Sequence, residues 1–128
     1  MSYFHSKILD VDFNTAIEQA TAALKTEGFG VLTDIDVQQT FKNKLDIDFK
    51  KYRILGACNP QFAHKAISEE DKIGVFLPCN VVVQEHPNGQ VEVSAVSPKA
   101  SMQSVENPSL ADIANEVEEK LLRVMDAI

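Results

Sequence analysis

The chain has 128 residues, of which 45% are hydrophobic and 24% charged, a composition that predicts one globular domain over residues 1–128. The net charge of −7 disfavours a nucleic-acid partner, because phosphate backbones are bound by basic surfaces. The N-terminus lacks the apolar segment of a signal peptide, and the most apolar stretch, residues 73–83, is too short to span a bilayer. We therefore expect a cytoplasmic protein with no membrane partner.

The first half of the chain predicts strands and helices in alternation. Asp12 is placed to cap a helix with apolar residues at helical spacing, which Gly28 can end in a left-handed conformation. Asp36, followed by Gln39, is typical of a capping box at the start of a shorter helix that runs to about Leu45. The strands predicted here cover residues 3–8, 31–35 and 52–57.

The second half predicts a helix, a hairpin and a long C-terminal helix. Asn59 and Pro60 favour a helix start, and that helix fades over residues 68–71. Residues 73–85 and 90–97 are predicted as strands joined by the turn 86–89, where Asn88-Gly89 favours positive φ. Residues 98–108 are expected to form a loop. The last helix carries one apolar stripe, made of Leu110, Ile113, Ala114, Val117, Leu121, Val124, Met125 and Ile128.

The predicted order is β-α-β-α-β-α-β-β-α. Helices with a single apolar stripe each bury one face against a sheet, so the order predicts an α+β two-layer sandwich. One face of the sheet then lacks a helical cover and must be polar, or occupied by a partner or ligand. The acidic runs at residues 68–71 and 116–119 are expected on the solvated surface.

Cys58 ends a predicted strand immediately before a predicted helix start. The free amides and dipole of a helix N-terminus favour a thiolate, so Cys58 is a candidate nucleophile or redox-active residue. Cysteine is also among the most buried residue types. The favoured interpretation is therefore that the Cys58 side chain fills a gap beneath the helix.

Cys79 belongs to a second motif, Pro78-Cys79-Asn80. Strand alternation places it on the helix-facing side, as a buried core residue, together with Val75, Leu77, Val81 and Val83. Pro78 complicates this assignment, because a proline inside a strand marks an edge or a bulge, and a bulge would reset the alternation.

The same alternation points Phe76, Pro78, Asn80 and Val82 toward the uncovered face of the sheet. Asn80 is the least expected of these, since asparagine is disfavoured within strands. An apolar patch with one amide suits a dimer interface or a shallow ligand site, and we favour the interface.

The motifs that would indicate catalysis or metal binding are missing. The two cysteines are too far apart for a CxxC motif, and zinc would need two further ligands from His5, His64 and His86. No paired catalytic carboxylates, phosphate-binding loop or Ser-His-Asp arrangement is recognisable. We expect no catalytic residue, no metal and no cofactor.

Three segments carry a resemblance to a known family: DVQQTFK at residues 36–42, YRILGACNP at 52–60 and LPCNVVV at 77–83. On these the chain resembles the bacterial and archaeal domain of unknown function number three hundred and two, over nearly its whole length. The resemblance implies a homodimer and a fold of the TATA-box-binding-protein-like α+β class, a curved, mostly antiparallel sheet with helices on one face. It implies no reaction, and the net charge of −7 opposes DNA binding.

The leading hypothesis is a small, non-enzymatic dimeric module. It would bind a small ligand or a protein partner around the ACNP and LPCN segments, with Cys58, Asn59, Pro78, Cys79, Asn80 and Phe76 as candidate binding residues. The alternative is thiol-based redox or nucleophilic chemistry at Cys58, with Cys79 as its partner.

Overall fold

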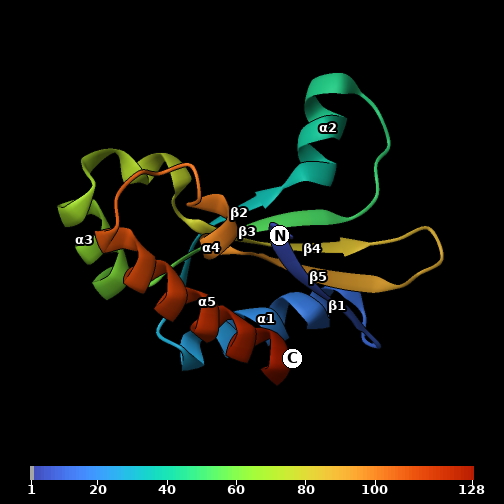
Figure 1. Cartoon of the computed structure of the whole chain (residues 1–128). Helices are drawn as coiled ribbons and strands as arrows, with labels where there is room; N and C mark the ends of the chain where they lie inside the picture. The colour runs from blue at the N-terminus through green and yellow to red at the C-terminus, as the bar shows by residue number, and fades with distance from the viewer. Residues whose placement is uncertain (1) are drawn as a thin grey trace.

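Five antiparallel strands form one open sheet in the computed structural model, which describes residues 2–128 (Figure 1). From one edge to the other the order is β1-β5-β4-β3-β2. The strands are β1 (Phe4–Leu9), β2 (Gly30–Asp36), β3 (Tyr52–Cys58), β4 (Cys79–Glu85) and β5 (Val91–Val96). The predicted α+β class with an antiparallel sheet is confirmed.

The helices differ in how they relate to the sheet. The two longest, α1 (Phe13–Thr26) and α5 (Ser109–Ala127), pack on one face, while α3 (Pro60–Glu69) and the short α4 (Pro98–Ser101) pack against α5. Helix α2 (Val37–Leu45) buries none of its residues and projects away from the rest of the molecule (Figure 1). The expectation that each helix buries a face against the sheet is therefore wrong for α2, most of whose side chains are polar.

The core lies between the sheet and the pair α1–α5. Alternate residues of the central strands, such as Val83 and Val93, are fully buried beneath Leu24 of α1 and Leu121 of α5. The predicted stripe of the C-terminal helix is buried at Leu110, Ala114, Val117, Leu121, Val124 and Met125. Burial of this apolar surface is the main stabilising term of the fold.

The predicted N-caps of α1 and α2 are confirmed, but the Gln39 side chain donates to Asn43 Oδ1 at 2.9 Å and does not complete the predicted capping box. The Asp12 carboxylate accepts a hydrogen bond from the Thr15 amide at 2.7 Å, and this bond lowers the pKa of Asp12 below its usual value. The Asp36 carboxylate accepts from the Gln39 amide at 2.9 Å. Both bonds satisfy amides that a helix start leaves unpaired.

Two segments differ from the sequence prediction. Residues Asp71–Phe76 form the 3₁₀ helix η1, so the strand predicted to begin at Ile73 begins at Cys79, and Val75 is 83% exposed instead of facing the core. Pro78, which follows a cis peptide bond, has no amide to donate to a neighbouring strand, which is why the strand starts after it. The predicted loop 98–108 contains α4, whose first turn begins with a proline.

Gly56 in the middle of β3 allows a close approach of two other segments. A Cβ atom at this position would lie 2.1 Å from Thr33 Oγ1 and 2.8 Å from Pro78 Cγ, both of which are impossible contacts. Thr33 on β2 and Pro78 before β4 therefore meet over the backbone of β3. This contact fixes the sheet at the end where the candidate site lies.

Candidate functional site

An apolar cavity of about 310 Å³ lies at the end of the sheet where β3 finishes and β4 begins. Its walls come from segments far apart in sequence: Cys58 and Cys79 on the strands, Phe62 on α3, Pro98 at the start of α4, and Val117 on α5. Phe62 and Val117 are buried in the molecule, and Met102, just after α4, is partly exposed. The cavity thus lies where the helix layer continues past the end of the sheet.

Asn59 joins the strand β3 to the helix that roofs the cavity. It occupies the predicted N-cap position of α3, but its side chain makes no capping hydrogen bond. Its Nδ2 atom instead donates to the Glu27 carbonyl at 3.2 Å, and it lies against Gly28, whose φ is +85°. Asn59 therefore ties the start of α3 to the turn after α1, and this bond orients the helix over the cavity.

The two cysteines are neighbours across β3 and β4, because Cys79 pairs with Ala57, the residue before Cys58. Both are free thiols that line the cavity. Burial raises the pKa of Cys79 to about 11, with smaller contributions from the nearby Cys58 and Glu118. At neutral pH the Cys79 side chain is therefore an uncharged thiol.

The structure separates the six residues proposed from the sequence. Cys58, Asn59, Pro78 and Cys79 line the cavity. Asn80, which pairs with Gly56, is exposed on the opposite face of the sheet, in a hollow of about 350 Å³ that it shares with Val82. Phe76 lies on η1, is 42% exposed and lines neither space, because the strand that was to align it with Asn80 does not exist there.

Glu118 was expected on the solvated surface, and that expectation is wrong. Glu118 is only 7% exposed to solvent. His5 Nε2 lies 2.6 Å from Oε1, the Ser97 hydroxyl donates to both carboxylate oxygens at 2.8 and 3.0 Å, and the Lys99 amide donates to Oε2 at 3.3 Å. A buried carboxylate needs such donors, and here they come from β1 and from the start of α4.

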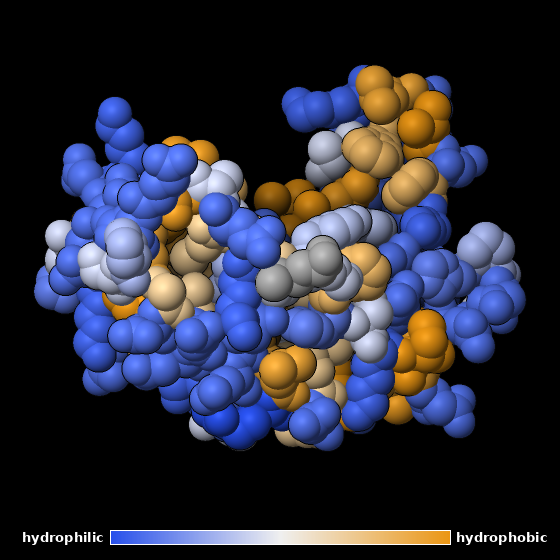
Figure 2. Space-filling view, viewed as in Figure 1, coloured by the Kyte–Doolittle hydropathy of each residue, from blue (hydrophilic) through white to orange (hydrophobic). Residues whose placement is uncertain are grey.

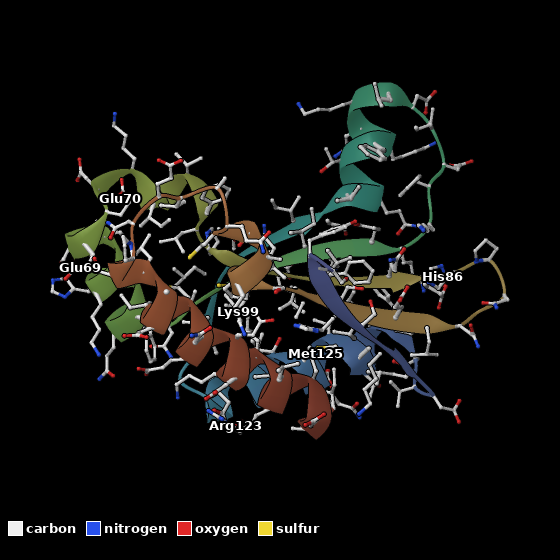
Figure 3. The ribbon with its side chains drawn as sticks, in the orientation of Figure 1. Glu69, Glu70, His86, Lys99, Arg123 and Met125 are labelled. Atoms are coloured by element: carbon white, nitrogen blue, oxygen red, sulfur yellow. The ribbon has the colours of Figure 1, made fainter. Side chains whose placement is uncertain are left out.

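The Glu118 cluster, defined as Glu118, His5, Ser97 and the Lys99 amide, holds α4 against α5. Figure 3 shows Lys99 on α4, which lies beside α5. Ser97 also accepts from the Ala100 amide at 3.3 Å, so the same hydroxyl caps α4 and binds the carboxylate. Because Pro98 and Met102 line the cavity, the cluster fixes one of its sides.

The burial of Glu118 has a signal in the sequence. Glu118 lies at helical spacing from Ala114 and Leu121, which are both buried on the same face of α5.

The histidines considered as metal ligands lie apart. His5 contacts Glu118, His86 contacts Glu92 at 2.8 Å near the β4–β5 turn (Figure 3), and His64 is exposed on α3. Within residues 2–128 the structure brings together no group of three or more His, Cys, Asp or Glu that could hold a metal ion.

None of the helices described within residues 2–128 is long and apolar enough to cross a membrane.

Comparison with known proteins identifies the family. The model of the domain of unknown function DUF302 matches residues 5–128, so the chain belongs to this family. Among solved structures, it is similar to an uncharacterized conserved DUF302 protein from Bacillus stearothermophilus, with a TM-score of 0.92 and 31% identity over 99% of this chain and 98% of that one. No curated protein matches the chain. The resemblance inferred from the ACNP and LPCN segments is thereby confirmed.

The Glu118 cluster predicts a specific loss of stability. Replacing Glu118→Gln removes the charge that the three donors face, and we expect the free energy of unfolding to fall by about 1–3 kcal/mol. Urea denaturation measures this change. The control is Glu119→Gln on the neighbouring, exposed residue, which should leave stability nearly unchanged. Equal effects of the two substitutions would contradict the assignment of Glu118 to the interior.

Proposed function

We propose that this protein is a binding module, without catalytic activity of its own, whose ligand site is the cavity between α3, α4 and α5. The observation that carries the proposal is the cavity itself, which brings together four of the six residues singled out from the sequence. Its volume of about 310 Å³ falls at the lower end of the range of small-molecule sites, roughly 300–1,000 Å³. Its walls come from three strands, three helices and the residues next to them, which suits a preformed site.

The ligand site is tested with a panel of eight-carbon compounds that carry a neutral, an anionic or a cationic head group. We expect at least one member to shift amide resonances of residues around the cavity in a ¹H–¹⁵N NMR titration. Ala63 lines the cavity from α3, so Ala63→Phe should abolish the shifts by filling the space. His64→Phe adds the same ring on the exposed side of that helix and should leave them intact. Binding that survives Ala63→Phe, or no binding by any member, would refute the site.

We further propose that a second copy of the chain covers the open face of the sheet, as the family resemblance implies. The open face and the projecting α2 segment expose apolar side chains that the monomer leaves without cover. Ile35 on β2 is 48% exposed, and Leu45, Ile47 and Phe49 are 62%, 44% and 38% exposed. Figure 2 shows apolar side chains on the projecting α2 side and on the floor of the notch beside it. Burial of these groups in a dimer would be favourable.

Sedimentation equilibrium tests this dimer. We expect twice the chain mass of 14.2 kDa for the wild type and the monomer mass for Ile35→Lys combined with Leu45→Lys, which would place charges in the interface. Leu122→Lys, on the outer side of α5 and 39% exposed, is the matched control and should remain dimeric. A wild type that is monomeric at micromolar concentration would exclude the dimer.

The alternative function is thiol chemistry at Cys58, with Cys79 as its partner. What favours it is the adjacency of the two residues across β3 and β4 at the wall of one cavity. Its redox form requires that mild oxidation with diamide link the two thiols in the native protein, and retention of both free thiols would remove that form. Slow alkylation of Cys58 by iodoacetamide even at alkaline pH would remove the nucleophilic form.

The raised pKa of Cys79 makes a prediction about pH that is independent of either function. In the unfolded chain the thiol ionises near its ordinary pKa of 9.0, whereas the folded protein holds it protonated to about 11. Stability contributed by the neutral thiol is therefore complete below pH 9 and is lost as the pH rises toward 11. Urea denaturation between pH 8 and 11 should show this decline in stability. The Cys79→Ala variant should lack the part of the decline that comes from ionisation of this thiol. Identical pH profiles for the two proteins would contradict the burial of the thiol.

Three finer expectations stay predictions of the sequence and the family resemblance. They are a cytoplasmic location, a bacterial setting and kinship of the fold with the TATA-box-binding protein. Burial of the open face by a second copy would also leave that face unavailable to DNA.

A further inference from the structure

The cavity differs in charge from three other hollows of the molecule. Among residues 2–128, none of those that line it is charged, although the chain as a whole carries a net charge of −7. The hollow beside α5 includes Lys99 and Glu106, the hollow on the open face of the sheet includes Glu92, and the one near the start of α1 includes Asp12. The uncharged lining is therefore a local property of this cavity.

The polar groups in the cavity wall are few and weak. They are the hydroxyl of Thr33, the amide of Asn59 and the two thiols. The Asn59 Nδ2 atom already donates to the Glu27 carbonyl, and the Cys79 thiol is neutral because burial raises its pKa to about 11. What remains of these side chains for a ligand is the Asn59 carbonyl oxygen, one hydroxyl and two thiols, none of which is charged.

The Lys65 and Lys120 ammonium groups lie 5.3 and 5.8 Å from the centroid of the Phe62 ring, but neither residue lines the cavity. Glu118 is a third charged group near the cavity that does not line it. Its charge contributes to the raised pKa of Cys79, so the carboxylate is near that wall. However, His5, Ser97 and the Lys99 amide already occupy its oxygens. A cationic ligand would have to compete with these donors, and an anionic ligand would meet a like charge.

From these observations we infer that the cavity binds an uncharged, apolar molecule with at most one weak polar group, such as a hydroxyl or carbonyl. This inference rests on the proposed function and names the ligand class for it. A charged head group would lose its hydration without a partner in such a wall, whereas an apolar body is favoured there.

The volume sets the size of the ligand. A cavity of about 150 Å³ lined by aliphatic and aromatic side chains holds one benzene molecule. The present cavity, at about 310 Å³, has roughly twice that space. It therefore suits a medium-length alkyl chain or a small bicyclic ring system. Phe62, Met102 and Val117 in its wall supply the apolar contacts for either shape.

The experiment compares 1-octanol, octanoate and octylamine at pH 7.5, which share one chain and differ in charge. Dissociation constants come from ¹H–¹⁵N NMR titrations of the full chain, with Ala63→Phe as the blocked variant and His64→Phe as its control. We expect octanol to bind at the cavity at least about tenfold more tightly than either charged compound. From hexanol to octanol, each added methylene should tighten binding by about fourfold until the cavity is full.

The outcomes distinguish a failure of the inferred ligand class from a failure of the proposed function. Octanoate or octylamine binding at the same residues as tightly as octanol would overturn the inference while leaving the cavity as a ligand site. Binding of none of the three would overturn the proposed function and this inference with it. Shifts that persist in Ala63→Phe would place the binding elsewhere and would also refute the inference.

Discussion

The helices of the described residues bury one face of the five-stranded sheet and leave the other open, and the rest of the structure depends on this constraint. Helices α1 and α5 cover that face, while the more peripheral α3 and α4 pack against α5. Where β3 ends and β4 begins, α3, α4 and α5 enclose the apolar cavity. The opposite face is left to solvent or to a partner. The cavity and the open face thus follow from one arrangement: helices too few to cover both sides of the sheet.

Close contacts join the elements that form the walls of the cavity. Gly56 lets Thr33 and Pro78 meet over β3, which fixes the strand side. The bond from Asn59 to Glu27 orients α3, and the Glu118 cluster holds α4 against α5. Of the residues in these contacts, Thr33, Pro78 and Asn59 line the cavity, whereas Glu27 and Glu118 do not. A largely apolar lining with a few polar groups is typical of small-molecule sites.

Much of the fold could be predicted from local patterns. The caps at Asp12 and Asp36 and the stripe of α5 each depend on residues close in sequence, and the structure confirms them. Cys58, Asn59, Pro78 and Cys79 were proposed together from the ACNP and LPCN segments, and all four line one cavity. The acidic run at residues 116–119 was misleading for Glu118, although the helical spacing of the buried residues around it indicated its burial. Glu118 is buried by donors from β1 and from the start of α4, which lie far from it in sequence.

Strand alternation was misleading for a different reason. It assumed that residues 73–85 form one strand, whereas η1 occupies residues 71–76 and the strand begins only after Pro78. Val75 and Phe76 were therefore assigned to faces of a sheet that they do not join. From Cys79 onward the alternation holds, with Val81 and Val83 buried and Asn80 exposed. The proline was the available signal that the strand could not extend before it.

The central claim is that the space between α3, α4 and α5 is an accessible apolar cavity. A crystal structure of the protein under xenon pressure tests it most directly, because xenon enters apolar cavities. We expect xenon to bind between Phe62, Met102 and Val117. A cavity occupied by ordered water and free of xenon, or collapsed by closure of these side chains, would contradict the account.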